Sequence, residues 1–363
     1  MNARRAGLAV VLAAATLTVA RGGHELPVYP SYYPHEIEIA TIAPERAAAL
    51  LIDGKLHAYP GSAPRFAAMP PDDVRSVETL GSFVLVRVNP AIDEHAACTV
   101  TRAAVQALAT SQEMVFHPYP VVPPHGDYLH HVDLAEAGKA RFAADANLSP
   151  LRLKAENPPA RRLVPDKWAA LSGADWDAEI VDVDAAQLVG QHAVAFNGWL
   201  EPPWLRAGWY QAALLLGGPE DAERLAQLEQ TVNESGVERI NRERELVRAL
   251  ASRCRVAVAG YTLKREYYNA EFSAGVENIG YDAIEGLTSP IFLRTVKLKD
   301  FPWNGWLALG VADAPVAAWN PIGGFSDRFG RLMWFAVGDP SLIPSPYDSA
   351  WMLNRAAEIR TAR

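Results

Sequence analysis

Histidine side chains are concentrated in the first part of the chain, where eight of the nine lie at or before residue 131. The densest group falls within the segment HPYPVVPPHGDYLHH, and its candidate metal ligands are His117, His125, Asp127 and His130. Imidazole and carboxylate groups suit copper, zinc or iron, and a proline-stiffened loop loses little entropy on binding. Their spacing matches no standard zinc motif, so hydrogen-bonded loop residues are the alternative interpretation.

A further candidate metal ligand, His24, depends on where the chain is cut on export. Copper or nickel binds an amino-terminal histidine, or a free Gly22-Gly23-His24 terminus, through amine and imidazole nitrogens. Such a site needs a cut after Gly23 or Arg21. The cut that we favour, after Ala20, produces neither arrangement.

Tryptophan has the opposite distribution. All ten tryptophans lie at or after residue 168, and two short segments repeat a pattern, FNGWL at 196–200 and WNGWL at 303–307. Indole rings can stack on sugars, aromatic rings or quaternary amines, but Asn-Gly is also a tight-turn pair. We therefore favour a turn with a packed indole for each segment, with a ligand site as the alternative. The candidate ligand-binding residues are Tyr33, Tyr59, Trp199, Trp303, Asn304 and Trp306.

No complete catalytic motif accompanies these side chains. The sequence lacks Gly-x-Ser-x-Gly and His-Glu-x-x-His segments, and Gly323-Gly324 lacks the lysine and setting of a phosphate loop. The acid pair Asp182 and Asp184 is present, although exposed carboxylates are the simpler interpretation. A net charge of −8 without basic blocks argues against nucleic acid as a partner.

Residues 1–20 have the pattern of a secretory signal peptide. Met1–Arg5 carries two arginines, and Leu8–Ala20 is apolar apart from two threonines. A membrane anchor that is never cleaved is the alternative. No cysteine lies near the end of the apolar run, so we expect no lipid anchor there. We expect a periplasmic mature protein, in which Cys98 and Cys254 either pair or remain buried thiols.

Alternation and turn residues predict the elements that position these side chains. Glu36–Ile42 alternates as a strand does, Pro44 can open a helix that runs to Leu51, and Asp53-Gly54 can end it. Further strands are predicted at 56–59, 77–88, 255–259, 291–296, 306–311 and 331–337. Further helices are predicted at 99–109, 133–144, 219–253 with a break at 235–236, and 349–360.

The size of the chain predicts two lobes. It has 363 residues, of which 50% are hydrophobic, and this exceeds what one compact core usually holds. We expect an α/β fold of mixed sheets flanked by helices, with a histidine-rich lobe over 21–150 and a tryptophan-rich lobe over 151–363. The irregular segment 147–165 is the candidate crossing between the lobes.

The segment EIEIATIAPERAAALLIDGKLHAYPG resembles a recurrent unit of bacterial periplasmic solute-binding proteins of the type II class. In that unit a strand leads to a helix and a Gly-Lys-Leu/Ile-x-Ala-Tyr turn, and the next strand lines the ligand cleft. The matching residues are Asp53, Gly54, Lys55, Leu56, Ala58 and Tyr59. At the position after Leu56, where the family usually has an aspartate, this chain has His57. The resemblance implies a two-lobed fold that closes on a ligand.

These observations favour a periplasmic protein that binds a small molecule or a metal and serves a membrane transporter or a sensor. The alternative is a metal-dependent periplasmic oxidoreductase, or an accessory subunit of one. In the accessory role, the proline- and tyrosine-rich arm 24–35 would dock as a strand on a periplasmic redox partner.

Overall fold

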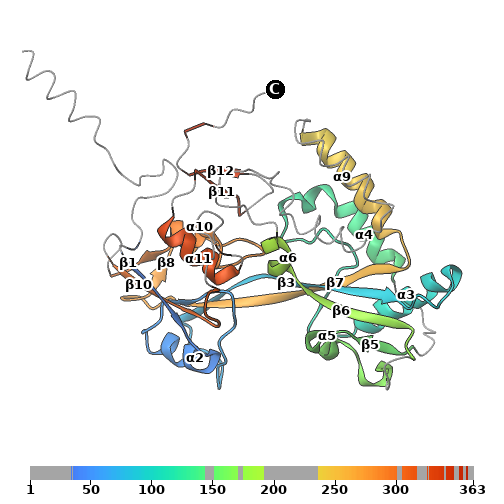
Figure 1. Ribbon diagram of the computed structural model, residues 1–363, viewed down its shortest axis with the longest axis horizontal. Coiled ribbons are helices and arrows are strands. Elements are labelled where there is room, and N and C mark those ends of the chain that lie inside the picture. Colours follow the sequence, from blue (N-terminus) through green and yellow to red (C-terminus); the bar gives the residue numbers. More distant parts are fainter. Residues whose placement is uncertain are drawn as a thin grey trace, which may run out of the picture.

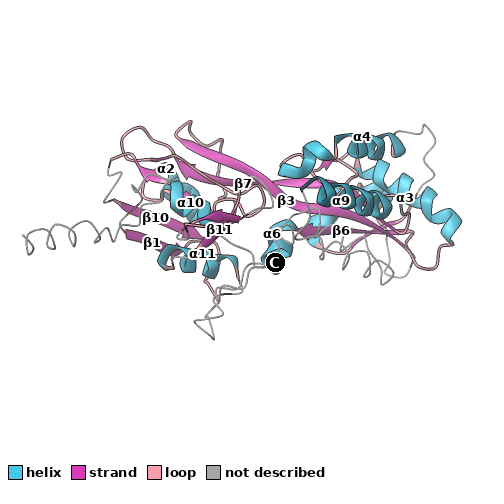
Figure 2. Cartoon of the chain, turned by 90° about the horizontal axis from the view of Figure 1, so that it is seen from above, coloured by secondary structure: helices cyan, strands magenta, loops and turns pink. Residues whose placement is uncertain are grey.

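The structure, a computed structural model, describes residues 34, 36–143, 151–170, 175–191, 236–300, 305–316, 325, 327–338, 341–346, 351–354 and 357–358. In this part of the chain an eight-stranded mixed sheet has the order β1-β10-β2-β7-β3-β6-β5, with β4 beside β7. Helices flank the sheet on both faces (Figure 1, Figure 2). The predicted α/β class, with a mixed sheet flanked by helices, is therefore confirmed.

The strands of the large sheet are β1 (Glu36–Thr41), β2 (Ala58–Tyr59), β3 (Val74–Val88), β4 (Val115–Phe116), β5 (Leu153–Ala155), β6 (Ala178–Asp184), β7 (Val256–Asn269) and β10 (Trp306–Val311). Two short ladders pair β8 (Val276–Glu277) with β9 (Lys297–Leu298) and β11 (Leu342–Pro344) with β12 (Trp351–Leu353). The α-helices are α2 (Pro44–Ile52), α3 (Glu94–Leu108), α4 (Val132–Arg141), α5 (Pro158–Leu163), α6 (Ala185–Gln191), α9 (Gly236–Ala251), α10 (Pro290–Thr295) and α11 (Arg328–Val337). The 3-10 helices are η1 (Gly126–His130) and η2 (Asp166–Trp168).

Local signals explain the first strand, helix and strand, which the sequence predicts correctly over 36–59. Pro44 occupies the first turn of α2, where its missing N–H costs no helical hydrogen bond. Gly54 follows the helix with a φ of 69°, a left-handed conformation that favours glycine. His57 Nδ1 accepts a hydrogen bond from Ala308 N of β10 at 2.8 Å, which fixes the turn against the sheet.

Two predicted strands are helices in the structure. Residues 291–296 fall largely in α10, which begins after Ser289, whose hydroxyl accepts from the N–H of Ile291, and which carries Pro290 in its first turn. Residues 331–337 belong to α11, which Asp327 caps. Helix α10 is buried on most sides and so shows no 3.6-residue pattern, whereas α11 leaves Met333 and Val337 exposed. In both, the capping residues are the signal for a helix.

The carboxyl-terminal helix predicted over 349–360 is also wrong where the structure can be read, because residues 351–353 form β12. The predicted signal peptide at 1–20 and the first part of the predicted helix, 219–235, lie outside the described residues. Among the residues that are described, no helix is both long and apolar enough to cross a bilayer.

The long strands β3 and β7 run through both ends of the molecule. They pair antiparallel from Val74 opposite Asn269 to Arg87 opposite Val256. At one end they enter apolar cores around α2, α10 and α11, which we call the α2 half. At the other end they enter cores around α3, α4, α5 and α9, which we call the α3 half (Figure 1). In the described residues, these two strands therefore run through both halves of the fold.

Each face of this strand pair is covered by different helices in the two halves. On one face Val74 packs with Leu51 of α2, whereas Phe83 packs with Val247 of α9. Figure 1 places α2 below the sheet and α9 above it. The strand pair therefore turns over between the halves, as the accumulated twist of long strands allows.

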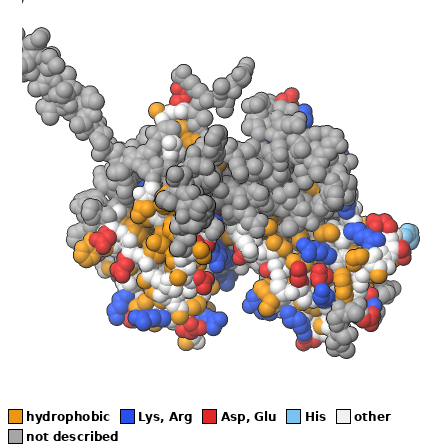
Figure 3. All heavy atoms as spheres, viewed as in Figure 1, with side chains coloured by type: hydrophobic (Ala, Val, Ile, Leu, Met, Phe, Trp, Pro, Cys, Tyr) orange, Lys and Arg blue, Asp and Glu red, His pale blue; other side chains and the backbone are white. Residues whose placement is uncertain are grey.

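We call the central part of the sheet, Thr79–Ser82, Asp182–Asp184 and Thr262–Lys264, the waist. The register of β3 and β7 shifts at Gly81, and such a bulge increases local twist. A Cβ at Gly81 would lie 2.8 Å from Thr262 Oγ1, so the bulge needs glycine. Figure 3 shows the surface hollowed between the two halves, on the side of α2 and α5.

Each half contains a core that brings together residues from both sides of position 150. One core of the α3 half joins Val105 with Leu163, and a core of the α2 half joins Val77 with Phe292. The described part of the segment 147–165 forms β5 and α5 within the α3 half. Strands β3 and β7 cross between the halves.

The two cysteines form a disulfide, which is one of the two outcomes that the sequence leaves open. Cys98 in α3 and Cys254 just before β7 are bonded, with 4.6 Å between their Cα atoms. Cys254 packs with Val88 and Ala97 at the outer end of the α3 half. The bond therefore joins the chain where it enters this half to the place where it leaves.

Candidate functional site

The waist carries a cluster of hydrogen-bonded polar side chains on one face. Because strand side chains alternate, Ser82 of β3, Asp182 of β6 and Thr262 of β7 point to the same face of three adjacent strands. The Ser82 hydroxyl donates to Asp182 Oδ2 at 2.6 Å, and its oxygen lies 2.6 Å from Thr262 Oγ1. Since the single Ser82 proton points to Asp182, Thr262 donates to Ser82.

The aspartates of the cluster are poorly neutralised. Burial raises the pKa of Asp182, the hydrogen bond from Ser82 lowers it, the nearby Asp184 raises it further, and Arg162 lowers it. Arg162 is shared, because its Nε also lies 3.8 Å from Glu113 Oε2. Two carboxylates with one shared cation suit a ligand that brings positive charge or hydrogen-bond donors.

Backbone and capping contacts hold both aspartates in place. Asp184 Oδ1 accepts a hydrogen bond from Gln187 N at 2.7 Å, in the first turn of α6. Asn157, which caps α5, donates through Nδ2 to the carbonyl oxygen of Asp182 at 2.8 Å. The cluster is therefore set by two helix starts as well as by the sheet.

A buried ion pair continues the polar face toward the α2 half. Lys264 Nζ lies 2.6 Å from Glu266 Oε1, and the Glu266 side chain is fully buried. Glu266 Oε2 accepts from Leu287 N at 2.5 Å. Opposite Lys264, the buried hydroxyl of Thr79 has no hydrogen-bond partner among the described residues. The waist thus contains polar groups that its own residues do not fully satisfy.

The turn 282–288 lies against the waist and contacts both halves. Leu80 N of β3 donates to Ala283 O at 2.8 Å. Ile284 packs in a core of the α3 half, whereas Leu287 packs in a core of the α2 half. Gly286 has a φ of 65°, and a Cβ there would lie 2.5 Å from Glu266 Oε2. This turn therefore holds the Glu266 carboxylate and connects the two halves beside β3.

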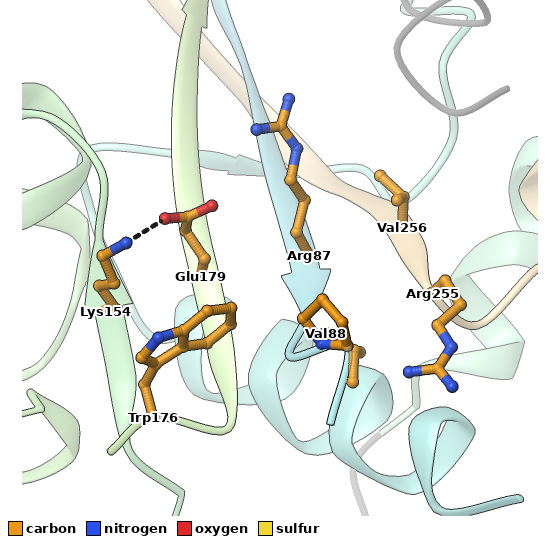
Figure 4. A pocket seen from close by; sticks show the side chains of 8 residues that line it. Arg87, Val88, Lys154, Trp176, Glu179, Arg255 and Val256 are labelled. Carbon is orange, nitrogen blue, oxygen red and sulfur yellow. Dashed lines mark hydrogen bonds and ion pairs between the residues drawn. The ribbon is translucent and has the colours of Figure 1, made fainter. Parts of the chain in front are cut away.

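A cavity, which we call the end pocket, lies at the outer end of the α3 half, where β3 ends and β6 and β7 begin (Figure 4). Its volume is about 570 Å³, a size typical of small-molecule sites. Its lining includes Arg87, Lys154, Trp176, Glu179, Arg255 and Val256. Three cations against one acid make this cavity basic, in contrast to the acidic waist.

In fold, the chain is similar to three solved structures. They are HbpA2 from Haemophilus parasuis (12% identity, 69% of this chain and 55% of that chain, TM-score 0.40), the oligopeptide-binding protein AppA from Bacillus subtilis in complex with a nonapeptide (13%, 70%, 58%, 0.36), and NikA from Brucella suis in complex with Fe(III)-EDTA (13%, 67%, 58%, 0.36). The chain spans less than two thirds of the length of each. No family model matches the sequence, and no curated protein matches it.

The predicted metal ligands do not converge in the structure. His117 is buried, its Nε2 lies 2.8 Å from Val121 O, and burial lowers its pKa. His125 Nδ1 accepts from Asp127 N at 3.2 Å, and the side chain of His130 is exposed. In the part of the chain that the structure describes, no three His, Cys, Asp or Glu side chains form a group able to hold a metal ion. The alternative of a metal-dependent oxidoreductase gains no support from these residues.

The histidine that sequence reasoning passed over, His131, is the one at the centre of a buried network. Its Nδ1 lies 2.8 Å from the Tyr119 hydroxyl, and its Nε2 lies 2.9 Å from Glu243 Oε1. Arg239, one turn earlier on α9, lies 2.7 Å from Glu243 and 3.3 Å from Asp127. This network attaches α9 to η1 and α4. The available signal was the Arg239–Glu243 spacing of four, which places both on one helix face.

The predicted ligand-binding aromatic residues are separated. Tyr59 is fully buried and donates to Ile42 O at 2.7 Å, so its side chain faces a core. Trp306 is 72% exposed at the edge formed by β1 and β10. The remaining candidates lie outside the described residues: His24, Tyr33, Trp199, Trp303 and Asn304.

Proposed function

We propose that this chain is a solute-binding protein that acts outside the cytoplasm, holds a small polar ligand at the waist, and serves a membrane transporter. The observation that carries the proposal is the Ser82, Asp182 and Thr262 cluster, placed on the two strands that join the halves, β3 and β7, and on β6 beside β3. Ligand sites occur preferentially at junctions between domains. We expect a ligand with amine or hydroxyl donors, because the cluster offers carboxylate and hydroxyl oxygens.

The energetics of the waist support a ligand there. A half-buried carboxylate without full compensation costs free energy, and a purely structural centre of a sheet would be apolar, as Val77 and Val84 are on either side. On the same face, Thr79 and Ser82 of β3 lie between these two valines, and Glu266 and Asp182 lie opposite them on the neighbouring strands. A bound cation or donor would offset the cost at Asp182 and Asp184.

The connection between the halves supports closure on the ligand. Strands β3 and β7 and the turn 282–288 join two separate groups of apolar cores. Hinge closure of two bodies around a ligand needs a few such connections and little else. We expect ligand to reduce the radius of gyration measured by small-angle X-ray scattering.

The disulfide supports a location outside the cytoplasm. Bonds such as Cys98–Cys254 persist in oxidising compartments and are rare in reducing ones. The signal-like residues 1–20 and the resemblance at 36–61 to type II periplasmic solute-binding proteins favour the same location. Amino-terminal sequencing of the exported protein tests the predicted cut after Ala20.

The binding test is calorimetry and native mass spectrometry with amino acids, short peptides, polyamines, sugars and divalent metals. Asp182→Asn should weaken the ligand found by about tenfold or more, because it removes a charged acceptor. Asp166→Asn is the matched control, since Asp166 is 94% exposed and pairs with Arg161. No binding of any compound in the panel, or equal binding by both variants, would contradict the proposal.

A second measurement tests whether the protein binds a metal ion. Elemental analysis of natively purified protein, repeated for His125→Ala and His130→Ala, tests the histidine-rich segment directly. Stoichiometric copper, zinc or iron that both substitutions remove would assign the metal to that segment. Metal that survives both substitutions would place it elsewhere.

A further inference from the structure

We propose that the end pocket is a second binding site, specific for a small aromatic carboxylate. This inference goes beyond the solute site at the waist and does not depend on it. It rests on the shape of the cavity, the charges in its wall and one indole ring.

The wall of the end pocket has an aromatic side and a cationic side. Figure 4 shows Trp176, Lys154 and Glu179 on one side, Arg255 and Val256 on the other, and Arg87 between them on β3, paired with Glu179 and Val256 of the neighbouring strands. Lys154 Nζ lies 5.4 Å from the centre of the Trp176 ring and 2.7 Å from Glu179 Oε1. The indole therefore lies beside an ion pair, and it offers a flat apolar surface on which a second ring can stack.

The side chain of Arg87 is available to an incoming anion. Arg87 Nη1 lies 3.6 Å from Glu156 Oε2, beyond hydrogen-bond distance, and its side chain is 37% exposed. A planar guanidinium can bind a carboxylate through two parallel hydrogen bonds. Arg255 is engaged with Glu94 at 2.7 Å, and therefore adds positive charge more than free donors.

The balance of charge excludes a cationic ligand. Arg87, Lys154 and Arg255 line the cavity with one acid, Glu179, which Lys154 already neutralises. The other carboxylates that pair with these arginines, Glu156 and Glu94, do not line the cavity. An anionic ligand is therefore favoured, and the ring of Trp176 favours an anion that also has a flat apolar part.

The end pocket is held rigid from below. Val88, which also lines the cavity, packs with Ala97 and Cys254 of the disulfide. Arg255 follows Cys254 directly, and Val88 N donates to Arg255 O at 2.9 Å. A preformed wall loses little conformational entropy when a ligand binds.

The test uses benzoate and naphthalene-2-carboxylate as probes, with acetate and inorganic phosphate as comparison anions, in calorimetry with the whole exported protein. Naphthalene-2-carboxylate should bind about tenfold tighter than benzoate, because its second ring buries more apolar area. Acetate and phosphate should bind more weakly than either. Equal or tighter binding of phosphate would overturn recognition of an aromatic ring.

Variants locate the binding. Arg87→Gln should weaken naphthalene-2-carboxylate by about tenfold and Trp176→Leu by about threefold or more. Arg65→Gln, in the exposed Arg65–Glu45 pair of the α2 half, is the matched control and should bind as the parent does. If Arg87→Gln lowers the thermal midpoint, Lys154→Gln replaces it and should weaken binding as well.

Three results would overturn the inference. They are no binding of naphthalene-2-carboxylate at millimolar concentration, equal binding by the parent and Trp176→Leu, and loss of binding in Asp182→Asn. The last result would move the aromatic anion to the waist. Conversely, the waist proposal can fail while naphthalene-2-carboxylate still binds at Arg87 and Trp176.

Discussion

The waist and the end pocket use the same two long strands for opposite chemistry. At the waist, Thr262 donates to Ser82 and Ser82 donates to Asp182, and Arg162, which lowers the pKa of Asp182, is shared with Glu113. At the end pocket, Arg87 and Arg255 have acidic partners that lie outside the cavity. One site is acidic and internally bonded, whereas the other is basic and open to an anion.

The difference follows from position along β3 and β7. The waist lies between two groups of cores, so its geometry depends on how the halves are placed. The end pocket lies within one half and beside the disulfide, so its geometry depends on that half alone. Ligand at the waist should therefore couple to motion of the halves, and ligand at the end pocket should not.

The largest effect is expected from removing the disulfide. Replacing Cys98 and Cys254 together by alanine should lower the free energy of unfolding by about 4 kcal/mol, because the bond closes a long loop. Urea unfolding of the parent, with and without reductant, measures it. A loss below about 1 kcal/mol would show that removing the disulfide adds little conformational freedom to the unfolded chain.

The double alanine variant also sharpens the comparison between the two sites. Under conditions where it remains folded, it should lose affinity for naphthalene-2-carboxylate at the end pocket while the waist ligand binds nearly as before. Equal losses at both sites would mean that the disulfide stabilises the whole molecule rather than its outer end.

A smaller effect is expected from the buried pair at the waist. Glu266→Gln should cost about 2–3 kcal/mol of unfolding free energy, because it leaves the largely buried Lys264 without its charge partner. Glu78→Gln is the matched control on the same strand pair. Its partner Arg265 is 60% exposed, so the expected change is below about 0.5 kcal/mol. Similar losses in both variants would remove the distinction between the buried and the exposed face.

The waist should respond to acid, and the end pocket should not. Burial raises the pKa of Asp182, so the folded chain holds this proton to a higher pH than the unfolded chain does. The free energy of unfolding therefore falls as pH rises from about 4 through the raised pKa. Asp182→Asn should flatten this decline relative to Asp166→Asn. Urea unfolding across that pH range measures it, and parallel curves for both variants would contradict the assignment.

The smallest effect concerns salt. The Arg87 side chain is partly exposed, so naphthalene-2-carboxylate should bind a few-fold more weakly when salt rises from about 0.05 M to about 0.5 M. The half-buried Asp182 is screened less, and a waist ligand should change less over the same range. Calorimetry at both salt concentrations gives the two ratios, and a reversed order would contradict the difference in exposure.

The sequence predicts the strands and helices whose signals are local. Alternation locates β1, and Pro44 with Gly54 bounds α2. It misassigns α10, because the apolar run IFLRTV suits a buried strand as well as a helix buried nearly all round. It also underestimates β7, whose polar residues Lys264 and Glu266 hide a 14-residue strand.

The waist cluster could not be predicted in the same way. Ser82 lies 100 residues before Asp182 and 180 residues before Thr262, and each is an ordinary polar residue of a strand. Only the pairing of β3 with β6 and β7 brings them together. The histidine-rich segment shows the reverse. Of its four close candidate positions only His125 and Asp127 contact each other, His117 bonds to Val121 O, and His131, which was not a candidate ligand, lies buried at the centre of a network.

The bond between Cys98 and Cys254 has a mechanical consequence. It closes a covalent ring of chain, with a separation of 156 residues, around almost everything in the α3 half. If the oxidised chain were pulled from its two ends, the residues inside the ring could not extend, and about 500 Å of contour length would not add to the end-to-end distance. A single backbone cut inside the ring would release no fragment until the disulfide was reduced. Strands β3 and β7 would therefore carry the whole load between the two halves.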